Sequence, residues 1–359
     1  MKLRRLVGIV KDNAAVSRAI TNTEFSALHI AILRATSHEE SPPQEKHVAM
    51  ILSAGSSSSR LRAARCVAEL LKRLTKTRNW AVALKSLIVV HRTLREGSFI
   101  FQDQLSLSPF RGGRNYLNMV NFRDCSSPAA WQASSWVRCY ARYVDQWLST
   151  CRVLGTFLGR GSTAAWTVTG LGNDELAGNL AALRDLLAAA CDCCHQSRPL
   201  ADNPVVSEGM RLVFTDAWQL EEEALLMLEE VQERMVELSP READDFLRVV
   251  EGLGAQQKEF RNTLIIADLV GPECAHVTER VGFCLARVGE SLRTVSGFTP
   301  LVTREPKGRH VSQSARFVRQ TPDTFRSCSA RMEGSAAVTV SAEKCHDNFW
   351  HYNGIDSLI

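Results

Sequence analysis

Three basic side chains around an expected helix start could bind a phosphate group. Arg34 ends one run of helical pattern, and Lys46 and His47 follow a polar loop that contains Ser41 and Pro42. Serine is a favourable N-cap and proline is tolerated in a first turn, so the sequence predicts a helix that begins near Pro42 with Ser41 as its N-cap. Amide groups at a helix start lack intrahelical partners and carry partial positive charge, which suits phosphate. On spacing alone, a solvated corner without a ligand is the alternative.

The elements that must position these side chains are helices. Apolar residues recur at helical spacing, and no strand-like alternation persists, so the chain is predicted to be all-α up to about Gly297. Sequential amphipathic helices with short connections favour a solenoid or layered bundle of stacked antiparallel helices. The expected helices cover residues 23–34, 42–53, 57–76, 77–97, 129–148, 175–191, 203–238, 240–262 and 274–292.

Two of these helices carry a patterned face. The helix over 129–148 has an aromatic stripe that is expected in the core; its aromatic members are Trp131, Trp136, Tyr140, Tyr143 and Trp147. The helix over 57–76 has a basic outer face that is expected to be solvated, although it could lie near the phosphate corner. This face consists of Arg60, Arg62, Arg65, Lys72 and Arg73.

The N-terminal segment allows two interpretations. Leu3, Leu6, Val7 and Val10 fall on one face of a possible short helix, with cations largely elsewhere. Such a helix could lie on an anionic membrane surface with its apolar face inserted, or it could be the first helix packed onto the domain. The pattern leaves both open.

Composition and cysteine usage exclude several classes of function. The chain has 359 residues and is 45% hydrophobic, which is ample for a large core. Its net charge of +4 is too small to indicate nucleic-acid binding. We find no signal-peptide pattern and no apolar run long enough to span a bilayer, so a cytoplasmic protein with at most peripheral membrane contact is expected. The eleven cysteines, an odd number, are expected to be reduced thiols.

Neither a metal site nor an enzyme site is predicted. The cluster Cys191, Cys193, Cys194 and His195 lacks a second ligand pair at zinc-site spacing, and adjacent helical residues point in different directions. His91 has no partnered nucleophile or carboxylate motif nearby, so a structural role is expected for it. We therefore expect no catalytic residues, no metal and no cofactor.

Several segments together resemble the ANTH domain of CALM-like clathrin-assembly proteins. Residues 28–48 are similar to its phosphoinositide-binding corner: Arg34 replaces a usual lysine, Lys46 and His47 match, and Gln44 stands where the family has a cation. A tryptophan-containing opening near Trp80, the His-Arg pair and the Leu-Arg-Glu-Gly close of residues 91–97 are also typical, as is the block from Phe122 to Tyr143.

This resemblance implies an ANTH α-solenoid over residues 1–297, similar to short plant members of the family. It implies a peripheral adaptor that binds phosphatidylinositol 4,5-bisphosphate on the cytosolic leaflet through Arg34, Lys46 and His47, with Lys11 and Gln44 beside them. Implied partners are clathrin and clathrin adaptor complexes, in endocytosis, at coated pits, coated vesicles and the Golgi apparatus. The alternative is a helical scaffold with weak or lost phosphoinositide binding that holds a partner helix such as a vesicle SNARE.

The last segment, residues 298–359, differs from the rest. It is polar, contains scattered arginines and shows little periodicity, so a disordered tail is expected. Two short Asp-x-Phe motifs occur in it, one with Asp323 and Phe325 and one with Asp347 and Phe349. Motifs of this form bind appendage domains of clathrin adaptor complexes, so these four residues are candidates for adaptor binding.

Overall fold

The computed structural model describes residues 2–20, 26–55, 60–107, 115–158, 168–197, 200, 202–266 and 272–297, which form eleven α-helices and no strand. The all-α prediction is therefore confirmed. The helices are α1 (Lys2–Ile20), α2 (Ser26–Ala35), α3 (Glu45–Ser53), α4 (Arg60–Lys76), α5 (Trp80–Glu96), α6 (Phe99–Leu107), α7 (Pro128–Leu154), α9 (Asn173–Ser197), α10 (Pro204–Glu233), α11 (Pro240–Ile266) and α12 (Pro272–Ser296).

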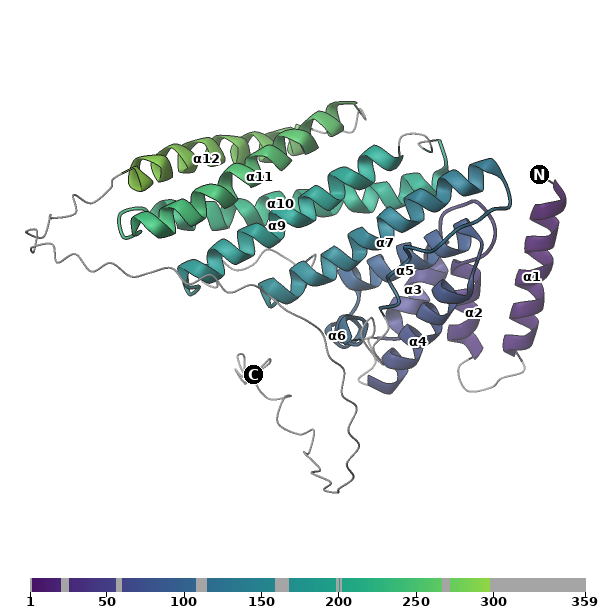
Figure 1. Cartoon of the computed structure of the whole chain (residues 1–359). Coiled ribbons are helices and arrows are strands. Elements are labelled where there is room, and N and C mark those ends of the chain that lie inside the picture. The colour runs from purple at the N-terminus through teal and green to yellow at the C-terminus, as the bar shows by residue number, and fades with distance from the viewer. Residues whose placement is uncertain are drawn as a thin grey trace, which may run out of the picture. The chain divides into compact units, whose positions relative to one another are not determined.

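Each helix packs mainly against helices that are close to it in the chain, as a solenoid requires (Figure 1). α1 packs on α2, α2 on α3 and α4, and α4 on α5 and α6. α5 then joins this group to α7 and α10, while α9, α10, α11 and α12 pack on one another. The stacked antiparallel arrangement predicted from the sequence is present.

The central helix α5 explains how the N-terminal helices hold together. From Trp80 to Arg95, only Arg92 is not fully buried, because α4, α6, α7 and α10 all pack around this helix. The aromatic stripe of α7 lies against it: Trp136, Tyr140 and Tyr143 are completely buried. Trp131 is an exception to the predicted stripe, since 54% of it is exposed and the guanidinium carbon of Arg123 lies 6.0 Å from its ring centroid.

The start of α3 differs from the prediction. The helix begins at Glu45, and Gln44 is its N-cap, with extended φ and ψ of −70° and 131°. Ser41 and Pro42 each precede a proline, and a residue in that position is driven out of the α region by the following ring. Proline is therefore a poor start signal when a second proline follows it. The structure also adds α6, which the sequence did not predict.

Two further expectations concern membranes and the tail. Within the described residues, no helix has both the length and the apolar character needed to cross a bilayer. The expected tail from residue 298 onwards, with Asp323, Phe325, Asp347 and Phe349, lies outside the described residues.

Candidate functional site: a basic corner between α2 and α3

The structure brings together the three basic residues predicted at the corner. Arg34 lies in the last turn of α2, and Lys46 and His47 lie in the first turn of α3. Arg34 and Lys46 are exposed, whereas only 8% of His47 is exposed. Burial, followed by the nearby charges of Lys46 and Arg34, lowers the pKa of His47. The corner thus combines two exposed cations with a largely buried histidine whose neutral form is favoured.

Gln44 occupies the junction between the loop and α3. Its backbone carbonyl accepts hydrogen bonds from the amides of His47 (3.0 Å) and Val48 (3.2 Å). Its exposed side chain makes no capping hydrogen bond. The amide side chain of Gln44 can therefore face a ligand at the corner without disturbing the helix start.

A buried lysine holds the loop that shapes the corner. Lys85 of α5 is 1% exposed, and its Nζ donates to Ser37 Oγ (2.9 Å) and to the Glu39 carbonyl (2.8 Å). Burial lowers the pKa of Lys85 to about 8, although the negative charges of Asp12 and Glu39 act against this shift. A cation this deep in a protein requires acceptors, and the loop supplies them.

An arginine and an aspartate complete the support of the loop. Arg73 of α4 donates to the Thr36 hydroxyl (3.2 Å) and the Thr36 carbonyl (2.9 Å). Asp12 of α1 accepts from the His38 amide (2.8 Å) and lies 2.7 Å from His38 Nδ1 and 3.4 Å from Arg73. Burial raises the pKa of Asp12, but the hydrogen bonds from His38 and the charges of His38 and Arg73 outweigh it and leave that pKa below its usual range. We call Asp12, His38, Arg73 and Lys85 the anchor cluster.

The anchor cluster also docks α1, and this places Lys11. A Cβ added to Gly8 would lie 2.8 Å from His38 Cβ, so the close approach of α1 to the loop requires glycine. Lys11 is exposed and directly precedes the docked Asp12. Of the two interpretations of the N-terminal segment, packing onto the domain is thus present in the middle of α1.

The apolar face of α1 is nevertheless open. Leu6 is 57% exposed, Val7 46% and Val10 66%. Lys11 lies one helical turn beyond Val7 on the same side of the helix. α1 therefore carries an exposed apolar strip beside a cation, which fits a membrane surface as well as the docked position.

One carboxylate in the first turn of α3 is engaged elsewhere. Glu45 accepts a hydrogen bond from Arg92 of α5 at 2.9 Å, and Arg92 also binds Glu96 at 2.7 Å. The hydrogen bond from Arg92 is the main reason that the pKa of Glu45 is lowered. The side chain of Glu45 is therefore engaged by α5.

The anchor cluster is what the sequence analysis missed. Arg73 was expected on a solvated face, but only 20% of its side chain is exposed, whereas Arg60, Arg62, Arg65 and Lys72 are exposed as predicted. The signal available was Lys85, a lone lysine in a helix that is apolar on most sides. Such a residue indicates a buried cation with acceptors on a neighbouring segment.

A second polar cluster is fully internal. His91 of α5 is completely buried; its Nε2 lies 2.6 Å from Asp216 Oδ2 of α10, and its Nδ1 lies 2.7 Å from the Tyr140 hydroxyl of α7. Tyr143 donates to the same Asp216 oxygen (2.7 Å), and Arg95 pairs with the other oxygen (2.7 Å). We call these five residues the buried joint. The carboxylate partner of His91 comes from 125 residues away, which is why no local motif revealed it.

The cysteine cluster forms part of the core. Cys191, Cys193 and Cys194 of α9 are buried, and Cys193 Sγ lies 3.5 Å from Cys139 Sγ of α7. Burial raises the pKa of Cys191 to about 12. Eight of the cysteines in the described ranges, these three among them, are free, and these ranges hold no group of three or more histidine, cysteine or acidic residues that could bind a metal.

The sequence of the chain is similar to those of several plant proteins. Three relatives in Arabidopsis thaliana are named as putative clathrin assembly proteins. The first is 44% identical over 198 residues, or 52% of this chain. The other two are 38% identical over 234 residues and 39% identical over 226 residues, each 60% of this chain. The matched regions cover 54%, 38% and 38% of those proteins, so the chain spans about half of the first relative and less of the others.

A solved structure shares the fold. The ENTH domain from epsin-2, in complex with phosphatidylinositol 4,5-bisphosphate, superposes with a TM-score of 0.51 at 16% identity. The match covers 71% of this chain and 97% of the epsin-2 chain. At this identity the likeness concerns the fold alone.

A family model gives the assignment. The model described as the ANTH domain matches residues 27–264, which include the corner between α2 and α3, the anchor cluster apart from Asp12, and the buried joint. With two thirds of the sequence covered and with the stacked helices that the resemblance implied, this chain belongs to the ANTH domain family.

Proposed function

We propose that the chain is a peripheral membrane adaptor that binds phosphatidylinositol 4,5-bisphosphate at the basic corner and assists the formation of clathrin-coated vesicles in endocytosis. The observation that carries this proposal is the convergence of Arg34, Lys46 and His47 on one corner whose loop is held by hydrogen bonds from Lys85 and Arg73. The names of the relatives support the link to clathrin, and the ligand of the epsin-2 domain supports the lipid.

The corner residues have distinct roles in this proposal. Arg34 and Lys46 donate charged hydrogen bonds to the phosphates, each worth roughly 1.5–3 kcal/mol when well formed. His47 donates a further hydrogen bond in either protonation state. The pKa of His47 is lowered in the free protein, and the negative charge of a bound phosphate raises it. Binding is therefore accompanied by proton uptake at His47, and the affinity for the phosphate increases as the pH falls and His47 becomes protonated.

The docked α1 adds a second kind of contact. Lys11 reaches the headgroup layer, while Leu6, Val7 and Val10 enter the boundary between headgroups and acyl chains. A few such contacts to one lipid give modest affinity. When many copies of the protein are held on one coat, the increased effective concentration strengthens their combined binding to the membrane.

The proposed partners follow from the family resemblance. Clathrin and clathrin adaptor complexes would be bound outside the helical domain, with the motifs at Asp323–Phe325 and Asp347–Phe349 as candidate adaptor ligands. Coated pits, coated vesicles and the Golgi apparatus are the places to look for the protein. A scaffold that holds a vesicle SNARE without the lipid is the second candidate, and the neutral, exposed side chain of Gln44 favours it.

Co-sedimentation of the full chain with liposomes tests the proposal. We expect sedimentation with liposomes that contain phosphatidylinositol 4,5-bisphosphate and little with liposomes that lack it. The double variant Lys46→Ala/His47→Ala should bind at least tenfold more weakly, since two headgroup contacts are lost. Because His47 is largely buried, Lys46→Glu is the second variant: this side chain is exposed, so the fold is retained while the charge is reversed.

A matched control separates the corner from general charge effects. Lys258 is an exposed lysine on α11, a helix that packs on α9 and α12. Lys258→Glu changes the net charge by the same amount as Lys46→Glu and should leave sedimentation nearly unchanged. Equal losses in the two variants, or binding without the phosphoinositide, would overturn the proposed site and favour the scaffold.

A further inference from the structure

An exposed tryptophan at the start of α7 stands among arginines that the proposed lipid site does not use. Trp131, Arg138 and Arg142 lie at positions i, i+7 and i+11 of α7, so they fall on one face of the helix. Arg123, which precedes α7, brings its guanidinium carbon to 6.0 Å from the centroid of the Trp131 ring. Arg123 and Arg142 are exposed, and Arg138 is partly buried. We call Trp131, Arg123, Arg138 and Arg142 the α7 patch.

Two guanidinium groups of the α7 patch converge on one oxygen atom. Arg123 donates to the Phe122 carbonyl at 2.7 Å, and Arg138 donates to the same carbonyl at 3.0 Å. Arg123 also donates to the Val120 carbonyl (2.8 Å), and Arg138 donates to the Ser135 hydroxyl (2.8 Å). These acceptors are neutral, so they orient the two guanidinium groups without cancelling their charge.

The positive charges of the α7 patch act on one another. The pKa of Arg138 is lowered, first by burial and then by the charges of Arg123 and Arg142. Like charges that are held close together cost free energy, and an anion bound among them removes part of this cost. The α7 patch is therefore suited to a negatively charged partner.

The carboxylates that are nearest to these arginines in the chain are engaged by other groups. Asp124 is 4% exposed and accepts a hydrogen bond from the Trp80 amide at the start of α5 (3.0 Å). Asp145 accepts from the Asn115 side chain (3.2 Å). Both aspartates thus hold elements of the fold together.

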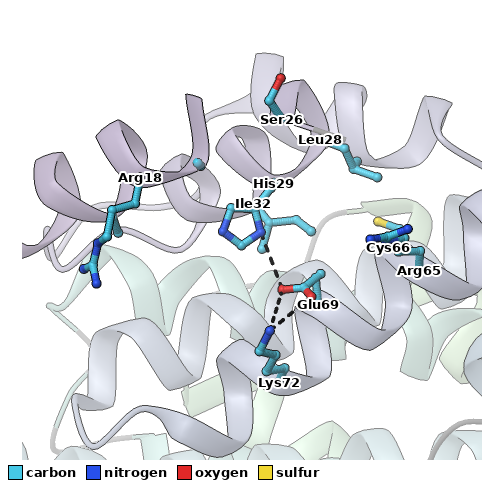
Figure 2. Close-up of a pocket in the computed structure, with 11 residues that line it drawn as sticks. Arg18, Ser26, Leu28, His29, Ile32, Arg65, Cys66, Glu69 and Lys72 are labelled. Atoms are coloured by element: carbon cyan, nitrogen blue, oxygen red, sulfur yellow. Dashed lines mark hydrogen bonds and ion pairs between the residues drawn. The ribbon is translucent and has the colours of Figure 1, made fainter. Parts of the chain in front are cut away.

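The basic face of α4 shows a different arrangement. There Lys72 donates to Glu69 at 3.2 Å, and His29 Nδ1 of α2 lies 3.5 Å from the second oxygen of the same carboxylate (Figure 2). The face of α4 thus supplies a carboxylate of its own, whereas the four residues of the α7 patch include none.

We propose that the α7 patch binds an acidic segment of a partner protein, with carboxylates on Arg123, Arg138 and Arg142 and an apolar side chain on Trp131. The guanidinium fork matches a carboxylate in a bidentate geometry, and tryptophan and arginine are the side chains that most often anchor protein interfaces. Trp131 and Arg142 are about 16 Å apart along the helix. An extended segment of about five residues spans this distance.

A protein segment fits the α7 patch better than a membrane does. The guanidinium of Arg123 lies over the Trp131 ring, so insertion of the ring among acyl chains would carry a cation with it, which costs free energy. A peptide can contact the ring and still offer a carboxylate to the guanidinium.

Selection from a random-peptide library displayed on phage tests the proposal. The full chain and the variant Arg123→Gln/Arg142→Gln serve as targets in parallel selections. We expect the wild type, but not the variant, to enrich peptides in which several aspartates or glutamates flank an aromatic or aliphatic residue. In fluorescence anisotropy, a labelled peptide from the wild-type selection should bind the variant about tenfold or more weakly, because two charged hydrogen bonds are lost.

Tryptophan emission shows whether the peptide binds at this place. The selected peptide should change the emission of the wild type, because Trp131 is exposed and lies in the proposed contact. Trp131→Phe should lose this change and keep its affinity within about threefold, since an aromatic ring is retained. An emission change that persists in Trp131→Phe would place the peptide elsewhere on the chain.

A substitution with the opposite sign excludes a trivial loss of folding. Asp192 of α9 is exposed, and its charge acts on the pKa of the Cys139 thiol in the opposite direction to that of Arg142. Asp192→Asn removes this competing charge, so peptide binding should tighten about two- to fivefold. The matched control Arg241→Gln/Lys258→Gln removes two exposed cations of α11 and should leave peptide binding unchanged.

The inference is wrong if the wild type enriches no acidic peptides, if both selections give the same peptides, or if Arg123→Gln/Arg142→Gln keeps the wild-type affinity. If this variant instead loses liposome sedimentation and no acidic peptide is selected, the α7 patch contacts a membrane. The corner variant Lys46→Ala/His47→Ala should bind the peptide as the wild type does. Failure of the proposed lipid site and failure of the α7 patch are therefore distinguishable.

Discussion

The basic corner and the buried joint use similar side chains in opposite ways. At the joint, the carboxylate of Asp216 meets His91, Tyr143 and Arg95, and every one of these groups is at most about 10% exposed. At the corner, Arg34 and Lys46 are exposed and lie beside a histidine whose pKa is lowered by burial and then by their charges. Two of the carboxylates nearby, Asp12 and Glu45, pair with Arg73 and Arg92.

This contrast distinguishes charged residues that hold helices together from charged residues that are available to bind a ligand. A buried ion pair whose oxygens are all approached by donors joins helices α5, α7 and α10 and leaves nothing for a ligand. A corner whose cations are exposed, and whose loop is held by hydrogen bonds from Lys85 and Arg73, is suited to an external anion. The anchor cluster lies between these two cases, because its buried lysine and partly buried Asp12, His38 and Arg73 hold the loop next to the exposed cations. Substitutions in the three places should therefore have different consequences.

The largest effect is expected at the joint. Asp216→Ala leaves Arg95 and His91 buried without their carboxylate, so the free energy of unfolding should fall by about 3–5 kcal/mol. Urea denaturation of the purified chain measures this change. Asp244→Ala, an exposed aspartate on α11, is the control and should cost less than about 0.5 kcal/mol. A small loss in Asp216→Ala would mean that the joint does not carry the packing of α5 on α10.

An intermediate effect, with a pH signature, is expected in the anchor cluster. Lys85→Met removes the donor to Ser37 Oγ and the Glu39 carbonyl, so stability at pH 7 should fall by about 1–3 kcal/mol. The loosened loop should also weaken binding of phosphoinositide liposomes, even though Lys85 is 1% exposed and touches no ligand. If Lys85→Met binds liposomes with wild-type affinity, the anchor cluster does not influence binding at the corner.

The sign of the pH dependence follows from the lowered pKa of Lys85. The folded chain releases the proton of Lys85 near pH 8, while the unfolded chain keeps it until about 10.5. Between these values the unfolded state binds more protons, so this lysine adds stability as the pH rises, up to about 3 kcal/mol. The stability difference between wild type and Lys85→Met should therefore grow from pH 8 to 10.5. A difference that stays constant would contradict the lowered pKa.

The smallest effect is expected at the edge of the corner. Gln44→Lys adds a cation beside Lys46 without removing a capping bond, so liposome affinity should rise about two- to tenfold. Gln256→Lys, on α11, makes the same change away from the corner and should leave affinity as it was. If the two variants bind equally, the side chain at position 44 does not face the lipid.

Periodicity was sufficient for most of the fold. The apolar spacing predicted the helices from α2 to α12 apart from α6, because a helix that packs on a neighbour must repeat its apolar residues every three or four positions. Arg34, Lys46 and His47 could be grouped because one helix end and the next helix start are joined by a short loop. The start of α3 was misplaced, although its cause, the restriction on residues before proline, is also local.

What only the tertiary structure decided is which charged residues are internal. Asp12 of α1, Arg73 of α4 and Lys85 of α5 meet at the loop that follows α2. His91 of α5 contacts Asp216, which lies 125 residues later in the chain. Arg73 and Lys72 are adjacent in the sequence, yet Arg73 supports the loop and Lys72 is an exposed side chain that pairs with Glu69. Helical spacing determines the side of a helix on which a residue lies; the packing of the helices determines what that side meets, and with it whether a charge is buried with a partner or left for a ligand.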